Sequence, residues 1–114
     1  MFEQHDDHSF ELVYVAYPNL KEASKISRVV IEKGLAACVN VIPGVLSFYK
    51  EEGQVVHAPE AILIAKTRAE ARAELQEFLI QHHPYDTPGL VVFPFQEGHK
   101  PYLDWIIRAT ITTN

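Results

Sequence analysis

Two strand-like segments, each followed directly by a helical pattern, constrain the fold of this chain most. Residues 10–17 (FELVYVAY) and 61–66 (AILIAK) are rich in β-branched, aliphatic and aromatic side chains, which favour strands. Behind each segment, apolar residues recur three or four positions apart, as on one face of a helix. They are Ala23, Ile26 and Val30 in the first half, and Ala71, Leu75, Phe78 and Leu79 in the second. The chain is therefore predicted to contain two βα halves.

Capping patterns mark where these helices begin and end. Asn19 and Glu22 are spaced as a capping box, and Thr67 and Glu70 form a second pair of the same kind. Gly34 stands where a helix commonly ends in the left-handed conformation. The sequence thus predicts one helix that begins after Asn19 and another that begins after Thr67.

A hairpin is predicted between the two halves. Residues 35–42 are typical of a strand, which the turn pair Pro43-Gly44 is expected to close. Strand-like residues then flank Glu51-Glu52-Gly53, which favours a hairpin over residues 45–57. Ala58-Pro59-Glu60 interrupts the pattern and predicts a bulge or bend before the next strand.

The remaining segments complete one domain. Residues 89–95 predict a last strand, in which Pro94 favours an edge position, and residues 102–107 predict a short C-terminal helix. Residues 1–9 are polar and are expected to form a flexible tail ahead of a single domain over residues 10–114. The resulting order predicts an α+β fold, a ferredoxin-like βαββαβ sandwich with an extended hairpin.

Charge and cysteine content restrict the function. Ten basic and fifteen acidic residues give a net charge of −5, whereas a nucleic-acid-binding protein normally carries a basic surplus. Cys38 is the single cysteine, which excludes an internal disulfide and a zinc site of several thiolates. Neither a signal peptide nor a membrane span is visible, so we expect a cytoplasmic protein. No nucleophile elbow or phosphate-binding loop is present, and we expect no enzymatic activity.

An ordered set of short motifs resembles the CutA divalent-cation tolerance family. The set includes LAACVN at residues 35–40, Lys66-Thr67, His83-Pro84-Tyr85 and YLDW at residues 102–105. The resemblance implies a ferredoxin-like subunit in a homotrimer, similar in architecture to PII signalling proteins, with a role in the response to copper or other divalent metal ions. The chain departs from the family pattern at Lys50 and Gly89, where many members have Trp and Glu, and at Val15, where some members have Cys.

The pair His82-His83 is the candidate metal site. Neutral imidazole is the commonest ligand of copper and other late transition metals. Consecutive residues of a regular helix point about 100° apart, but Pro84 ends the helix here and could let the two rings converge. The alternative is a pair of exposed histidines at a helix end, stabilised by the helix dipole.

Other residues of the family pattern are candidates for a cleft or for structural roles. Candidates to line a cleft between subunits are Tyr49, Lys66, Thr67 and Tyr85, although each also has an ordinary packing or capping role. Cys38 and Trp105 are expected to be structural, as a buried inert thiol and a packing anchor. If the ligand is not a metal ion, the alternative function is a PII-like trimeric sensor of small molecules or a signalling scaffold.

Overall fold

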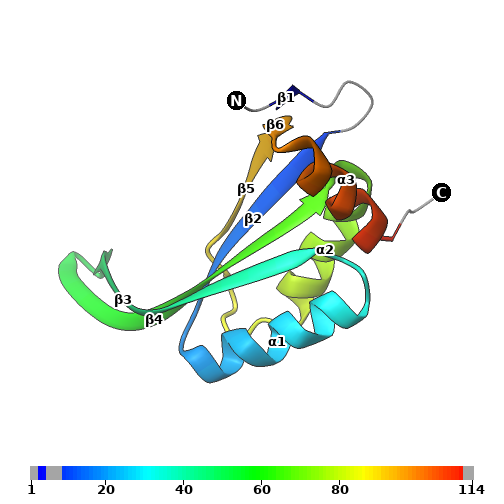
Figure 1. The fold of residues 1–114 in the computed structure, drawn as a ribbon. Helices are drawn as coiled ribbons and strands as arrows, with labels where there is room; N and C mark the ends of the chain where they lie inside the picture. Colours follow the sequence, from blue (N-terminus) through cyan, green and yellow to red (C-terminus); the bar gives the residue numbers. More distant parts are fainter. Residues whose placement is uncertain (1–2, 5–8, 112–114) are drawn as a thin grey trace.

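A four-stranded antiparallel sheet organises the molecule (Figure 1). The computed structural model describes residues 3–4 and 9–111. Its elements are β1 (Glu3–Gln4), β2 (Phe10–Tyr17), α1 (Leu20–Glu32), β3 (Cys38–Glu51), β4 (Gln54–Arg68), α2 (Ala69–Gln81), β5 (Leu90–Phe95), β6 (Glu97–Gly98) and α3 (Lys100–Ala109). The sheet order β3-β4-β2-β5 confirms the predicted ferredoxin-like α+β fold, and it leaves β5 at an edge, as Pro94 favours.

The main core lies between the sheet and the helices α1 and α2 (Figure 1). Val13, Val15 and Tyr17 of β2 are buried on this side of the sheet, as strand alternation requires. Val30 of α1 and Leu75 of α2 are fully buried against them. No helix of the described residues is both long enough and apolar enough to cross a membrane.

A smaller core holds α3 at one end of the sheet. Phe10 lies among Leu103 and Ile106 of α3, and its ring stacks on Phe95 with centroids 5.4 Å apart. At the same end, β1 pairs antiparallel with β6. Within the predicted tail, Glu3–Gln4 therefore form a short strand, and residues 1–2 and 5–8 lie outside the described part of the chain.

The hairpin is longer and more continuous than predicted. We expected Pro43-Gly44 to end a strand, which is wrong, because β3 continues through a register shift between Ile42 and Val45. Pro59 does not interrupt β4 either. Pro59 pairs with Leu46, whereas β2 pairs with β4 only from Ala61 onward, so β4 has a neighbouring strand on one side only at Pro59. Residues 45–60 thus form a two-stranded arm that projects from the body (Figure 1).

The second predicted capping box is also wrong. Thr67 is the penultimate residue of β4, and its hydroxyl donates to the carbonyl oxygen of Leu35 at 2.8 Å instead of capping α2. The N-cap position belongs to Arg68, whose side chain makes no capping hydrogen bond. Arg68 is buried and donates to the carbonyl oxygen of Thr110 at 3.2 Å. Tertiary hydrogen bonds therefore replace the predicted local one.

Candidate functional site

At the end of α2 the chain turns so that the His83 side chain packs against the last residues of β2. The helix ends at Gln81, with His82 at its C-cap and Pro84 unable to continue it. The His83 ring stacks on Tyr17 with centroids 4.2 Å apart. Its Nε2 donates to the carbonyl oxygen of Ala16 at 2.8 Å. His83 thereby connects the end of α2 to the last two residues of β2.

The other nitrogen of the His83 ring is also engaged. The backbone N–H of Tyr85 donates to Nδ1 at 3.0 Å, so Nδ1 carries no proton and Nε2 holds the proton that Ala16 accepts. Burial lowers the pKa of His83 below its ordinary value, against the opposing effects of the Ala16 carbonyl and the Glu60 charge. Both hydrogen bonds fit the neutral ring, and protonation of Nδ1 would break the one with Tyr85.

Tyr85 extends this network to β4. Its hydroxyl donates to Oε2 of Glu60 at 2.8 Å. Burial, this hydrogen bond, the charge of Glu60 and that of Tyr49 together raise the pKa of Tyr85 to about 12. The chain Glu60–Tyr85–His83–Ala16 joins the base of the arm to the end of β2. No spacing in the sequence places Glu60 beside Tyr85, 25 residues away.

His82 points elsewhere. Its Nδ1 lies 3.0 Å from the carbonyl oxygen of Phe78, and its exposed ring packs on the Phe78 ring with centroids 4.2 Å apart. That contact leaves Nε2 of His82 available as a ligand, whereas His83 can bind a metal ion only by giving up one of its two hydrogen bonds. Among the described residues, no three His, Cys, Asp or Glu side chains cluster as metal ligands do. Residues 3–4 and 9–111 of one chain therefore do not present a preformed metal centre of three such side chains.

The four predicted cleft residues fall in two places. Tyr85 donates to Glu60, and Tyr49 lies near enough for its charge to help raise the pKa of Tyr85. Lys66 and Thr67 lie at the opposite end of β4, where Lys66 Nζ is 5.7 Å from the centroid of the Tyr102 ring and Thr67 is fully buried. Within one chain these residues do not share a cleft, so a common cleft would have to form between chains.

The two predicted structural residues are less enclosed than expected. Cys38, the first residue of β3, is half-buried. Trp105 is 40% exposed, and its ring stacks on Tyr102 with centroids 5.6 Å apart. Their surroundings in the single chain therefore include solvent.

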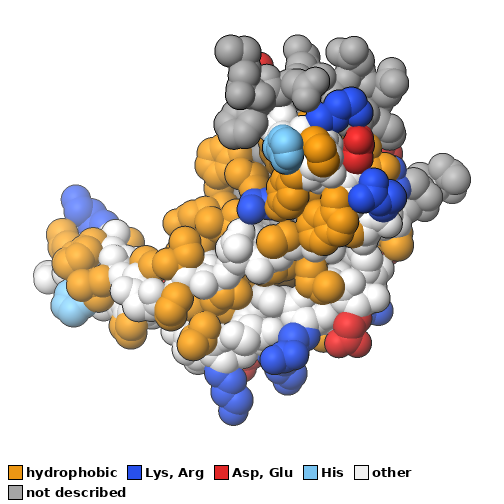
Figure 2. Space-filling view, in the orientation of Figure 1, with side chains coloured by type: hydrophobic (Ala, Val, Ile, Leu, Met, Phe, Trp, Pro, Cys, Tyr) orange, Lys and Arg blue, Asp and Glu red, His pale blue; other side chains and the backbone are white. Residues whose placement is uncertain are grey.

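Exposed apolar side chains gather on two neighbouring surfaces. The sheet face turned away from α1 and α2 exposes Tyr14, Ile42, Val91 and Phe93, here termed the outer face. The arm exposes Leu46, Phe48, Tyr49 and Val55, and Figure 2 shows hydrophobic side chains running along it onto the body. Contiguous apolar surface of this kind marks interaction sites in soluble proteins.

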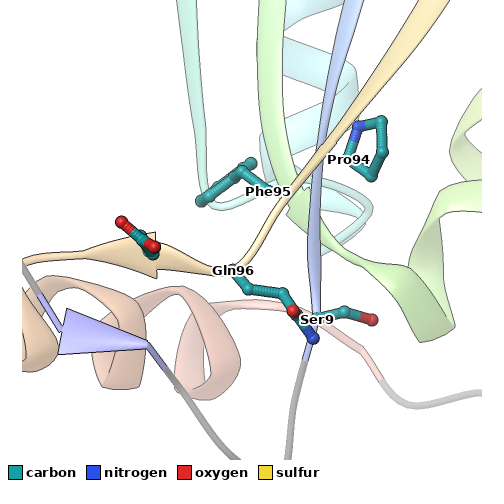
Figure 3. Close-up of a pocket in the computed structure, with 5 residues that line it drawn as sticks. Ser9, Pro94, Phe95 and Gln96 are labelled. Carbon is teal, nitrogen blue, oxygen red and sulfur yellow. The ribbon is translucent and has the colours of Figure 1, made fainter.

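A separate hollow lies where β2 begins and β5 ends (Figure 3). It is lined by Ser9, Pro94, Phe95, Gln96 and Glu97, and has a volume of about 590 Å³. Pro94 and Phe95 point to opposite sides of β5, as successive strand residues do. Glu97 is the only ionisable side chain among these lining residues, so they offer little for catalysis or metal binding.

Comparisons with known proteins agree over nearly the whole chain. Residues 11–109 match the family described as CutA1 divalent ion tolerance protein. The chain is 40% identical over 100 residues to the divalent-cation tolerance protein CutA of Thermus thermophilus, covering 88% of this chain and 97% of that one. It is 37% identical to mouse Protein CutA, covering 90% of this chain but 58% of the mouse protein. The crystal structure of CutA1 from Oryza sativa superposes with a TM-score of 0.87 at 36% identity, covering 93% of this chain and 96% of that one.

Proposed function

This chain belongs to the CutA1 divalent ion tolerance protein family, and from that premise we propose that it is a homotrimer that binds copper or other divalent cations and contributes to the response to metal ions. Related chains carry divalent-cation tolerance in their names. The proposal is for a binding protein without catalytic activity. We propose a cytoplasmic setting, which suits a chain with a single thiol and no disulfide partner.

The exposed apolar side chains of the outer face and the arm are the observation that best supports a homotrimer. Phe48 is 64% exposed and Val55 is 72% exposed, on a two-stranded arm whose free edges have no covering element among the described residues. Unpaired strand edges and exposed apolar side chains are both stabilised by pairing with another chain. A homotrimer is the assembly that the CutA resemblance implies, and closed symmetry would bury these surfaces on every subunit.

Metal binding is proposed through the His82-His83 pair, with His82 as the first ligand. Nε2 of His82 is the imidazole nitrogen of the pair that makes no hydrogen bond with the described residues. His83 joins only when its hydrogen bond to Ala16 or Tyr85 is broken. Copper is the preferred ion because it leads the affinity series for nitrogen ligands. Further ligands would have to come from another subunit or from solvent.

Copper(II) titration by calorimetry tests the metal part of this proposal. The parent protein carries His5→Ala and His8→Ala, so that the N-terminal histidines do not compete for the ion. The variant with His82→Ala and His83→Ala added is expected to bind copper at least ~10-fold more weakly, and binding by the parent is expected to weaken as pH falls below about 6.5.

The matched control removes the same number of imidazoles elsewhere, with His57→Ala and His99→Ala. Its affinity is expected to equal that of the parent. If the His82/His83 variant and the parent bind copper equally well, the proposed metal site is wrong. Light scattering of the parent tests the assembly separately, and a mass near one chain would contradict the trimer.

A PII-like sensor of small molecules remains the second candidate function. The observation that favours it is the engagement of both His83 nitrogens by backbone groups, which makes His83 a poor ligand at neutral pH. Titration of the same parent with nucleotides in place of copper separates the two functions. Saturable nucleotide binding without copper binding would favour the sensor.

A further inference from the structure

A hollow between α1 and α2 lies apart from the outer face and the arm, and it shares one lining residue, His82, with the metal site proposed above. It lies on the helix side of the molecule and has a volume of about 440 Å³, within the usual range of small-molecule sites. One wall is α1, which contributes Ile26 and Val29, and the other is α2, which contributes Phe78. Because α1 and α2 cover the opposite side of the sheet from the outer face, assembly through the outer face leaves this hollow open (Figure 1).

The floor of the hollow holds an unpartnered polar group. Tyr17 is 1% exposed, and its hydroxyl makes no hydrogen bond to any described residue. Stacking on His83 holds the ring in place. Buried hydroxyl groups almost always have a partner, since leaving one without costs free energy. A ligand oxygen that reaches the floor would accept this hydrogen bond.

Charges at the rim favour a ligand with one negative charge. Lys25 and Lys33 of α1 line the hollow, and Lys33 Nζ lies 5.6 Å from the centroid of the Phe78 ring. Glu22, one turn earlier on α1, opposes them, so the rim carries two positive charges and one negative charge. This balance attracts a monoanion and disfavours a strongly charged polyphosphate. Ile26 and Val29 offer apolar contact between the charged groups.

We propose that the α1–α2 hollow binds a small aromatic carboxylate. The aromatic body packs against Ile26 and Val29, the carboxylate faces Lys25 and Lys33, and an oxygen of the ligand accepts a hydrogen bond from the Tyr17 hydroxyl. This site goes beyond the proposed metal binding and assembly. It shares His82 with the proposed metal site but requires neither a metal ion nor the trimer.

Titration of the full chain with 2-naphthoate tests the proposal. Calorimetry gives the Kd, and amide chemical-shift changes are expected on α1 and α2. Lys25→Gln combined with Lys33→Gln is expected to raise the Kd about tenfold, because both attractive charges are removed. Lys21→Gln is the matched control, since Lys21 is exposed on the same helix but does not line the hollow, and its Kd is expected to match that of the wild type.

Tyr17→Phe distinguishes a binding role from a structural one. It removes only the unpartnered hydroxyl, so it is expected to raise the Kd about threefold while the unfolding midpoint stays the same or rises. An unchanged Kd in either Tyr17→Phe or the double lysine variant would overturn the proposal, as would shift changes confined to the outer face. Light scattering on the same variants is expected to give the mass of the wild-type protein. The Kd therefore tests the ligand site, and the mass tests the trimer, independently of each other.

Discussion

The backbone N–H of Tyr85 donates a hydrogen bond to Nδ1 of His83 across 3.0 Å. Because a backbone amide can only donate, this contact holds the His83 ring in its neutral form with the proton on Nε2. Nuclear magnetic resonance of the imidazole is expected to show this tautomer at neutral pH and a titration midpoint below 6.5. A midpoint above 6.5 would contradict the geometry.

The lowered pKa of His83 also predicts how the free energy of unfolding depends on pH. The pKa of His83 is lower in the folded chain than in the unfolded chain, so the unfolded chain binds the proton first as pH falls. The contribution of His83 is therefore complete above about 6.5 and is lost as pH falls toward the lower, folded-state pKa. In His83→Gln, which does not titrate, the denaturation midpoint is expected to fall less between neutral and mildly acidic pH than in the wild type. Equal slopes would rule out this contribution.

The hydrogen bond from Tyr85 to Glu60 is expected to stabilise the base of the arm. Tyr85→Phe should lower the free energy of unfolding by about 1 kcal/mol, the usual value for one such bond. The pKa of Tyr85 is raised to about 12 in the folded chain. The stability lost in Tyr85→Phe is therefore expected in full below the ordinary pKa of tyrosine, and it should vanish as pH rises through the folded-state pKa. Tyr49→Phe removes a hydroxyl nearby and serves as the control. Equal effects of the two substitutions would show that the Glu60 contact adds nothing.

Substitutions at two glycines with a left-handed backbone allow the cost of backbone strain to be compared with the cost of a steric clash. Gly34 has φ +70° and Gly53 has φ +78°, but only at Gly34 would an added Cβ meet another side chain, Cγ2 of Ile111 at 2.9 Å. Gly53→Ala is expected to cost about 1–2 kcal/mol from the backbone alone. Gly34→Ala should cost clearly more, as measured by urea denaturation. If the two variants lose equal stability, the contact with Ile111 does not constrain the turn.

A charge on the arm is expected to dissociate the proposed trimer. Wild-type protein should scatter light as about three times the 12.9 kDa chain mass, and Phe48→Glu should shift the mass toward one chain. Phe48 is 64% exposed in the single chain, so this substitution should leave the subunit folded by circular dichroism. Gln54→Glu adds the same charge at the tip of the arm and is expected to keep the wild-type mass. A trimeric Phe48→Glu protein would exclude the arm from the interface.

Local sequence patterns were sufficient to predict a helix end where a single residue determines it. Asn19 caps α1 as predicted, with Oδ1 accepting from the N–H of Glu22 at 2.8 Å. Gly34 has the positive φ expected beyond the end of that helix. Pro84 follows the end of α2. These residues act on backbone atoms within a few positions of themselves, so their effect can be read without knowing the rest of the fold.

Only the tertiary structure decided the features that depend on distant neighbours. Thr67 had the spacing of a helix cap, but it donates to Leu35, 32 residues away, because the end of β4 lies against that segment. Pro59 remains inside a strand because β2 does not pair with the arm. The sequence by itself determined the two βα halves, the C-terminal helix and the family, since periodicity and motifs are local properties, but it did not predict the pairing of β1 with β6. The opposite directions of His82 and His83 were decided by Phe78, Ala16 and Tyr85, which packing brings to the two rings.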